Sequence, residues 1–155
     1  MLGLESNLRV NPELAHKLCF EVTETSAVAN LHFASDFMRE MKRLNCRFAL
    51  DDFGTGLSSY AYLQKLPVDF VKIDGIFVKD MATNLTNYAM VRSINELCHF
   101  LDLQTIAEYV EDMEIMDTLK EIQVDYAQGF AIARPRRLDS LGTSNSTPPV
   151  YAYKK

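Results

Sequence analysis

The stretch Phe48-Ala49-Leu50-Asp51-Asp52-Phe53-Gly54-Thr55-Gly56-Leu57-Ser58-Ser59 decides how the rest of the chain is interpreted. Its apolar start is typical of a buried strand that stops at two adjacent carboxylates, and the glycine loop after them needs a tightly turning backbone. Side chains alternate faces along a strand, so two neighbouring Asp residues meet only where the strand curls. Two interpretations stay open: a divalent-cation site, or an Asx-type turn with solvated carboxylates before a helix cap at Ser58 or Ser59.

The composition is that of a globular chain of single-domain size. It has 155 residues, 48% of them hydrophobic and 24% charged, and a formal net charge of -5. The sequence has no dense Lys/Arg run, which argues against a nucleic-acid polymer as a partner but is compatible with a small anionic ligand held through metal ions. No stretch reads as a signal peptide or a membrane span, so we expect a cytoplasmic piece without membrane contact, whose parent protein could be anchored elsewhere.

Three cysteines, Cys19, Cys46 and Cys98, lie far apart in apolar surroundings without a C-x-x-C spacing. This pattern predicts buried thiols in a reducing cytoplasm.

Strand and helix patterns alternate along the chain. Strands are predicted at 18–23, 47–51, 68–74, 103–108 and 124–130, amphipathic helices within 27–44, 90–101 and 115–122, and a short helix at 60–66. About five βα units with short connections predict an α/β fold with parallel strands and helices outside the sheet. The Gly/Ser/Thr/Asn/Pro content after residue 141 predicts a disordered tail over 142–155.

Polar residues cluster at the carboxyl ends of the predicted strands. In parallel α/β sheets the loops at that edge converge on the active site. We therefore expect one site to receive residues from five successive strands, namely Glu21, Asp51, Asp52, Lys72, Glu108 and Gln128.

Carboxylates gathered in one pocket repel one another and stay ionised only beside cations, so one or two Mg²⁺ or Mn²⁺ ions are the natural partners. Adjacent Asp51 and Asp52 favour a two-metal site, and two cations about 3.5–4 Å apart support phosphodiester hydrolysis. Lys72 could then orient the attacking water or take up phosphate charge. The same residue types also fit proton abstraction next to a carboxylate, with Lys72 as the base, and the pattern favours the phosphodiester interpretation only modestly.

Five motifs of the chain resemble, in order, the last five strand motifs of EAL domains. EAL domains are β/α barrels that, when active, hydrolyse cyclic di-GMP to linear pGpG with Mg²⁺ or Mn²⁺ in bacterial second-messenger signalling. The resemblance covers roughly residues 1–140 and implies that residues 1–141 form the C-terminal part of a TIM-like barrel. The motifs are Phe20-Glu21-Val22-Thr23-Glu24-Thr25, Leu50 to Ser59, Val68-Asp69-Phe70-Val71-Lys72-Ile73-Asp74, Ile106-Ala107-Glu108-Tyr109-Val110-Glu111 and Ala127-Gln128-Gly129-Phe130.

The resemblance also implies a role for each matching residue. Glu21, Asp51 and Asp52 match metal ligands, Glu108 matches a further metal-site glutamate, and Lys72 matches the lysine near the catalytic water. Gln128 matches a glutamine of the pocket, and Glu111 the second acid of the strand-seven motif. Glu24 matches the glutamate that steadies the loop after the Asp pair, a loop that also takes part in dimer contacts and substrate binding. The loop includes Gly54, Thr55, Gly56 and Ser58. An N-cap or salt-bridge role is the alternative for Glu24 and Glu111.

The sequence departs from the family pattern in two ways. The motif that names the family and the next strand's metal-ligating asparagine normally lie upstream of Glu21, and this chain begins too late to hold them. A complete barrel takes about 250 residues, so we expect a C-terminal portion that is weak or inactive by itself. Tyr109 stands where the family usually has Gly, and we expect this substitution to be tolerated while reshaping one wall of the pocket.

A binding module is the alternative to an enzyme. Degenerate family members bind cyclic di-GMP or mediate dimerisation without catalysis. An unclosed parallel sheet also exposes unpaired edges, so we expect a homo-oligomer formed through those edges or through the loop after Asp52.

Overall fold

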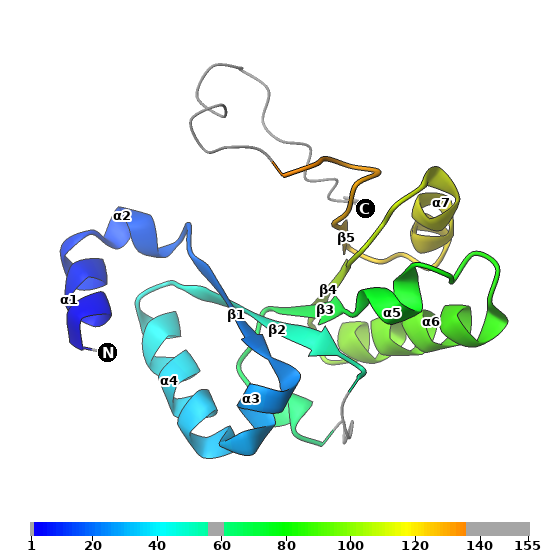
Figure 1. Ribbon diagram of the computed structural model, residues 1–155. Helices are drawn as coiled ribbons and strands as arrows, with labels where there is room; N and C mark the ends of the chain where they lie inside the picture. Colours follow the sequence, from blue (N-terminus) through cyan, green and yellow to red (C-terminus); the bar gives the residue numbers. More distant parts are fainter. Residues whose placement is uncertain (1, 56–60, 136–155) are drawn as a thin grey trace, which may run out of the picture. The chain divides into compact units, whose positions relative to one another are not determined.

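A computed structural model describes residues 2–55 and 61–135 of the chain (Figure 1). The chain divides into two compact units, Met1–Val71 and Lys72–Lys155. The predicted tail, 142–155, lies outside the described residues.

Before β3, the described residues of the first unit form two parallel strands and four α-helices. Strand β1 pairs with β2 in a register that runs from Cys19 opposite Arg47 to Thr23 opposite Asp51. The elements, in chain order, are α1 (Leu2–Val10), α2 (Pro12–Ala15), β1 (Cys19–Thr23), α3 (Glu24–Ala29), α4 (Leu31–Arg43), β2 (Arg47–Phe53) and the single 3₁₀ turn η1 (Leu63–Lys65).

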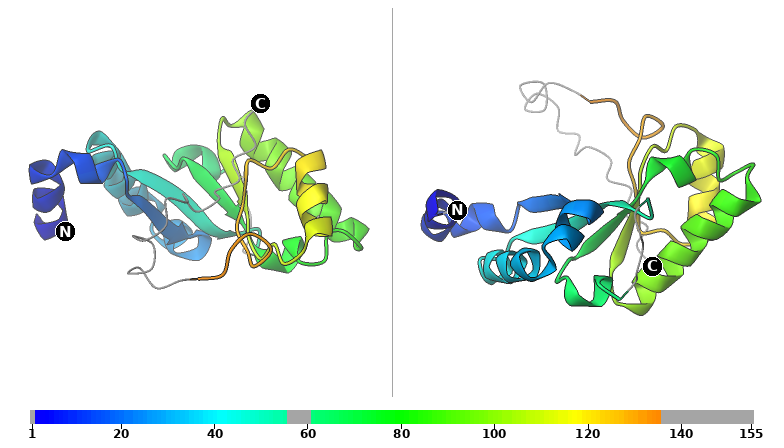
Figure 2. Two further views of the ribbon diagram at one scale, coloured as in Figure 1. Left: turned by 90° about the horizontal axis from the view of Figure 1, so that it is seen from above. Right: turned by 60° about the horizontal axis from the view of Figure 1, so that its bottom comes forward.

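The boundary between the units falls within β3 (Phe70–Ile73). The second unit continues with α5 (Gly75–Val78), α6 (Leu85–Phe100), β4 (Gln104–Ala107), α7 (Met113–Glu121) and β5 (Tyr126–Ala127). Strands β4 and β5 are parallel, with Ile106 opposite Tyr126, and α6 packs along β4 (Figure 2). The strand order β1-β2-β3-β4-β5 confirms the predicted α/β fold.

Side-chain caps explain where the helices begin. The Asn84 side chain accepts hydrogen bonds from the backbone N–H groups of Thr86 and Asn87 at the start of α6, and Asp112 accepts one from Ile115 at the start of α7. Asn30 caps α4 in the same way, which divides the single helix predicted over 27–44 into α3 and α4.

Several predicted boundaries were wrong. Strand β2 continues past the Asp pair to Phe53, whereas β5 has only two residues of the seven predicted. The helix predicted at 60–66 is the 3₁₀ turn η1 within the part that the structure describes. Helices α2 and α5, with four residues each, were not predicted because such short helices leave little periodicity in the sequence, and α1 was also missed.

Two of the three cysteines are buried as predicted. Cys46 and Cys98 are buried, whereas Cys19 is exposed at the first position of β1, so the prediction for Cys19 was wrong. Burial, aided by the charge of Asp125, raises the pKa of the Cys98 thiol to about 12, which keeps it protonated at neutral pH.

An aspartate before β3 fixes the start of β2 in the first unit. Asp69 accepts a hydrogen bond from the Phe48 backbone N–H at 2.9 Å, and its other oxygen lies 2.6 Å from Nζ of Lys42, in the last turn of α4. The carboxylate therefore joins a helix end to the beginning of a strand.

The second unit repeats this arrangement. Asp125, just before β5, accepts a hydrogen bond from the Thr105 backbone N–H at 2.8 Å and lies 2.8 Å from Nε2 of His99, in the last turn of α6. Thr105 also bonds to buried Asn95 of α6, whose amide donates to the Ile122 carbonyl at 2.8 Å. A polar network thus anchors α6 to β4.

Candidate active site

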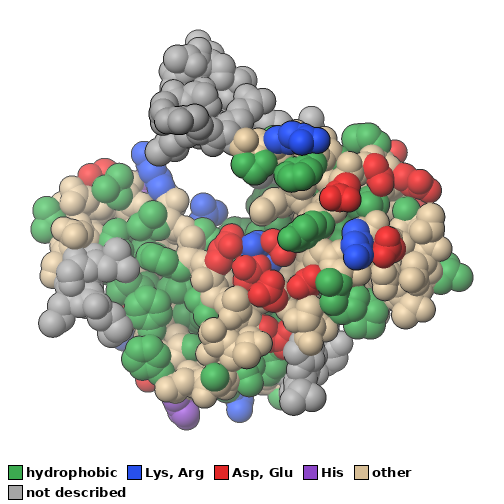
Figure 3. All heavy atoms as spheres, in the orientation of Figure 1, with side chains coloured by type: hydrophobic (Ala, Val, Ile, Leu, Met, Phe, Trp, Pro, Cys, Tyr) green, Lys and Arg blue, Asp and Glu red, His purple; other side chains and the backbone are tan. Residues whose placement is uncertain are grey.

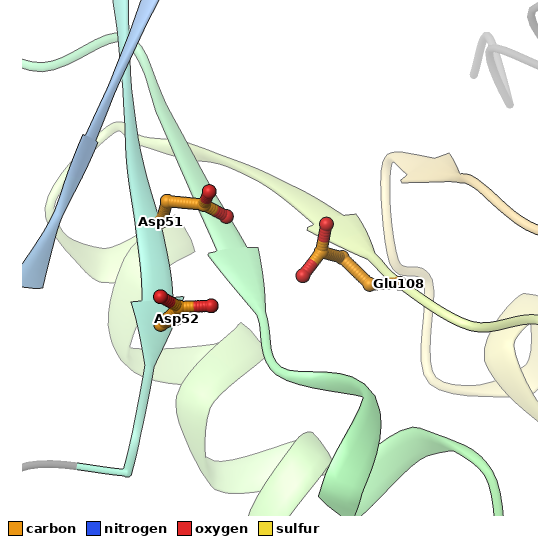
Figure 4. Close-up of side chains that lie close together, drawn as sticks. All are labelled: Asp51, Asp52 and Glu108. Atoms are coloured by element: carbon orange, nitrogen blue, oxygen red, sulfur yellow. The ribbon is translucent and has the colours of Figure 1, made fainter.

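The Asp51–Asp52 pair lies at the carboxyl end of β2, with Asp51 half-buried and Asp52 exposed (Figure 4). Asp52 has a φ of 56°, in the left-handed region that Asp tolerates better than most residues. One oxygen from each of the two carboxylates lies within 4.8 Å of the other. The backbone twist at Asp52 thereby presents together two side chains that an ordinary strand would send to opposite faces.

Glu21 lies in the middle of β1 and is not directly opposite the Asp pair. The register places Glu21 opposite Ala49, two residues before the level of Asp51. Two residues in a strand correspond to about 7 Å and to the same face of the sheet. Glu21 thus shares a face with Asp51 but lies nearer the middle of its strand.

Buried Glu24 forms hydrogen bonds with two residues that follow the Asp pair, Gly54 and Tyr62. One oxygen of Glu24 accepts a hydrogen bond from the Gly54 backbone N–H at 3.1 Å, and the other accepts one from the Tyr62 hydroxyl. These contacts fit the predicted loop-stabilising role of Glu24. Nothing in the sequence pattern marked Tyr62, which lies 38 positions from Glu24.

The loop itself is only partly described. Gly54 has a φ of 104°, which requires glycine, and the Thr55 hydroxyl donates to the Asp52 carbonyl at 3.0 Å. Gly56 and Ser58, also predicted for this loop, lie outside the described residues.

In the second unit Lys72 and Glu108 form a buried ion pair. Nζ of Lys72 lies 2.8 Å from Oε1 of Glu108, and the two side chains are only 4% and 12% exposed. Lys72 lies within β3, while Glu108 follows β4 and donates its backbone N–H to the Ile73 carbonyl at 3.2 Å. The ammonium therefore sits against a carboxylate that the backbone holds at the strand end.

A pocket of about 300 Å³ opens beside Glu108. We call it the Tyr109 pocket, and its lining residues are Glu108, Tyr109, Glu111, Gln128, Gly129 and Phe130. Gln128 is held by its backbone, which donates to the Ala107 carbonyl at 2.8 Å and accepts from the Val110 N–H at 3.1 Å. The structure thus places the predicted Gln128 and Glu111 around one cavity with Glu108.

Two glycines allow the backbone around the Tyr109 pocket to approach closely. A Cβ on Gly129 would overlap the backbone of Val110, and a Cβ on Gly75 would overlap the ring of Tyr109. Tyr109 has a φ of 54°, in the region where glycine is favoured. The sequence marked Tyr109 as a departure, whereas Gly75 and Phe130 carried no signal that would tie them to this pocket.

The parallel strands, the helices beside them and the acidic residues at strand ends define an α/β domain of the TIM-barrel type. The family model described as "EAL domain" matches residues 3–135, and the chain belongs to this family.

Comparison with known proteins supports this assignment. The chain is 51% identical over 123 residues to the cyclic di-GMP phosphodiesterase PdeB of Shewanella oneidensis, covering 79% of this chain and 14% of that protein. It is 38% identical to the cyclic di-GMP phosphodiesterase PdeF of Escherichia coli, covering 88% of this chain and 18% of that protein. The structure of the phosphodiesterase PaMucR in complex with c-di-GMP matches with a TM-score of 0.77 at 31% identity, over 82% of this chain and 51% of that chain.

The chain therefore spans less than a fifth of the length of these curated relatives and about half of the solved PaMucR chain. No helix among the described residues has the length and apolar character needed to cross a membrane.

We predict that Tyr62→Phe lowers the free energy of unfolding by about 1–3 kcal/mol, because buried Glu24 loses a hydrogen-bond donor. Urea titration of the purified chain measures this difference. Tyr126→Phe is the matched control, since its exposed hydroxyl lies 3.5 Å from Gln104, and we expect a change below about 0.5 kcal/mol. Equal effects of the two substitutions would contradict a special role for Tyr62.

We predict that Lys72→Met destabilises the metal-free chain by about 3–5 kcal/mol, because it leaves the Glu108 carboxylate buried without its cation. Lys120→Met is the control, since Lys120 pairs with Asp117 at 2.6 Å on the surface, with 43% and 67% of the side chains exposed. That change should cost less than about 1 kcal/mol. Adding Glu108→Leu to Lys72→Met should recover most of the lost stability, and failure to recover it would show that the pair is not the cause.

Proposed function

We propose that this chain is the C-terminal part of a metal-dependent phosphodiesterase that hydrolyses cyclic di-GMP to pGpG in bacterial signalling. The observation that carries the proposal is the pair of neighbouring carboxylates, Asp51 and Asp52, presented together at the end of β2. Relatives that carry the phosphodiesterase name, and a related phosphodiesterase solved with c-di-GMP, support the same substrate.

The donor set fits Mg²⁺ or Mn²⁺. Asp51 and Asp52 at the end of β2, Glu108 after β4 (Figure 4), and Glu21 in β1 offer only carboxylate oxygens, the ligands that these hard cations prefer. When bound, such cations polarise the phosphodiester and lower the pKa of a coordinated water. We propose these four residues as the part of the metal site that this chain supplies.

We propose Lys72 as the residue that acts on the attacking water or on the phosphate. Its ammonium lies 2.8 Å from the Glu108 carboxylate, and a positive charge at this position would orient the attacking water or take up charge from a phosphate oxygen. In the hydrolysis, the water oxygen bonds to phosphorus, the bond from phosphorus to the 3′-oxygen breaks, and the departing oxygen gains the proton that the water loses. The ring opens and linear pGpG results.

We place this reaction in the cytoplasm. Cys46 and Cys98 are buried thiols outside any disulfide, which is typical of a reducing compartment. A domain of the same parent protein could still be anchored to a membrane.

A cyclic di-GMP-binding or dimerisation module is the second candidate. The observation that favours it is the position of β1 and β5 at the two ends of the strand order, each with one described neighbour. Large hydrophobic side chains are also exposed, among them Val10 and Leu14 in the first unit and Phe100 and Phe130 in the second, and Figure 3 shows such side chains on the molecular surface. Open strand edges and exposed apolar groups both favour association.

We predict that the full-length protein releases pGpG from cyclic di-GMP with Mg²⁺ or Mn²⁺, that EDTA abolishes this release, and that Asp51→Asn lowers kcat by at least about 100-fold. Nucleotide chromatography measures the product. Asp36→Asn, on the exposed side of α4, is the matched control and should leave kcat unchanged. The 155-residue chain alone should be weak or inactive.

Two other results would decide against this proposal. Cyclic di-GMP binding without turnover by the full-length protein, with and without Mg²⁺, would favour the binding module. Cleavage that Asp51→Asn leaves intact would remove the Asp pair from the mechanism.

We also predict that the purified chain self-associates, because β1 and β5 lie at the two ends of the strand order among the described residues and large hydrophobic side chains are exposed. Size-exclusion chromatography with light scattering should give a mass above the 17.6 kDa of one chain. A well-folded monomer would contradict this prediction.

A further inference from the structure

The backbone of Tyr109 is held in an unusual conformation. Its φ of 54° lies in the left-handed region, where a side chain costs about 1–2 kcal/mol relative to glycine. Among the described residues with positive φ other than glycine, the rest are Asn45, Asp52, Asp102 and Gln123, all of them Asn, Asp or Gln. Tyr109 is the aromatic exception, so its ring must contribute something that offsets the cost.

The ring is fixed in place but not covered. It packs on the first residue of α5, because a Cβ on Gly75 would overlap Cγ and Cδ2 of the ring. Nevertheless 63% of the Tyr109 surface is exposed. A buried neighbour on one side and solvent on the other leave a rigid aromatic surface available to a ligand.

This surface belongs to the Tyr109 pocket, beside Glu108. The pocket's volume of about 300 Å³ is at the small end of the range of about 300–1,000 Å³ found for ligand pockets, so it holds one nucleobase rather than a whole dinucleotide. Among the lining residues, Glu108 and Glu111 carry carboxylates and none is cationic, while Lys72 pairs with Glu108 and Arg134 lies 5.0 Å from the centroid of the Phe130 ring. The carboxylate of Glu111 repels a phosphate but does not repel a neutral base.

The polar groups of the Tyr109 pocket complement guanine. Exposed Glu111 offers carboxylate oxygens to the N–H donors of the guanine edge, and exposed Gln128 offers an amide donor to O6. Phe130, which is 55% exposed, adds a second aromatic side chain to the lining. Aromatic side chains stack on bases with about 1–3 kcal/mol per base.

We propose that Tyr109 is a substrate-binding residue that stacks on one guanine base of cyclic di-GMP, in a position where the family usually has glycine. This inference rests on the proposed function and adds to it a specificity-determining residue of this particular chain. The sequence predicted only that Tyr109 is tolerated, whereas this proposal gives the ring a favourable contribution to substrate binding.

The experiment measures kcat and KM for cyclic di-GMP hydrolysis by the full-length protein and four variants. Tyr109→Asn and Tyr109→Gly accept the left-handed backbone but lack the ring, and each should raise KM by about 5- to 150-fold, the stacking energy converted to affinity, with kcat little changed. Tyr109→Phe keeps the ring and should stay within about twofold. Phe100→Ala removes an aromatic side chain that is 84% exposed at the end of α6 and should change neither constant.

Melting temperature separates binding from folding. The Asn and Gly variants relieve the backbone strain and should melt no lower than the wild type. A raised KM accompanied by a clearly lower melting temperature in both variants would overturn the proposal in favour of a structural role.

The remaining outcomes are also decisive. Wild-type hydrolysis with unchanged KM in Tyr109→Asn would overturn the stacking role and leave the proposed function intact, as would a fall in kcat alone. A wild-type protein that neither binds nor cleaves cyclic di-GMP would overturn the proposed function and the stacking role together.

Discussion

Two opposite charges, Lys72 and Glu108, are removed from water together in the second unit, 2.8 Å apart. Desolvation costs each ion several kcal/mol, and only close pairing with further hydrogen bonds offsets it. The arrangement therefore fixes where the lysine and the glutamate lie, and with them the end of β4. The backbone bond from Glu108 to the Ile73 carbonyl ties that end to β3, so the polar residues that follow begin from a defined point.

The conformation of the segment after Glu108 depends on a close approach between its backbone and the backbone after β5. Gly129 lets the chain after β5 lie against the backbone of Val110, and the Val110 N–H bonds to the Gln128 carbonyl. Gly75 similarly makes room for the ring of Tyr109. The walls of the Tyr109 pocket are therefore set mainly by main-chain geometry, while its chemistry comes from the few side chains that project from it.

The sequence predicted the parallel α/β architecture and the acidic strand ends because alternating periodicities and strand-terminal carboxylates are local patterns. It did not reveal that β2 runs on to Phe53 or that Asp52 takes a positive φ, since backbone dihedrals at a single residue depend on what surrounds it. Contacts between distant positions were equally hidden. The Glu24–Tyr62 bond and the packing of Tyr109 on Gly75 join residues with no shared motif, and only the folded chain brings them together.

Aspartate has two different tasks at the two ends of these strands. Asp69 precedes β3 and Asp125 precedes β5. Each accepts a hydrogen bond from a backbone N–H and contacts a basic residue in the last turn of a helix, so both carboxylates stabilise the fold. Asp51 and Asp52 lie at the opposite end of β2. This division lets sequence change at one edge of the sheet alter the chemistry while the other edge keeps the architecture. The separation is incomplete, because the Lys72–Glu108 pair serves both stability and the proposed chemistry.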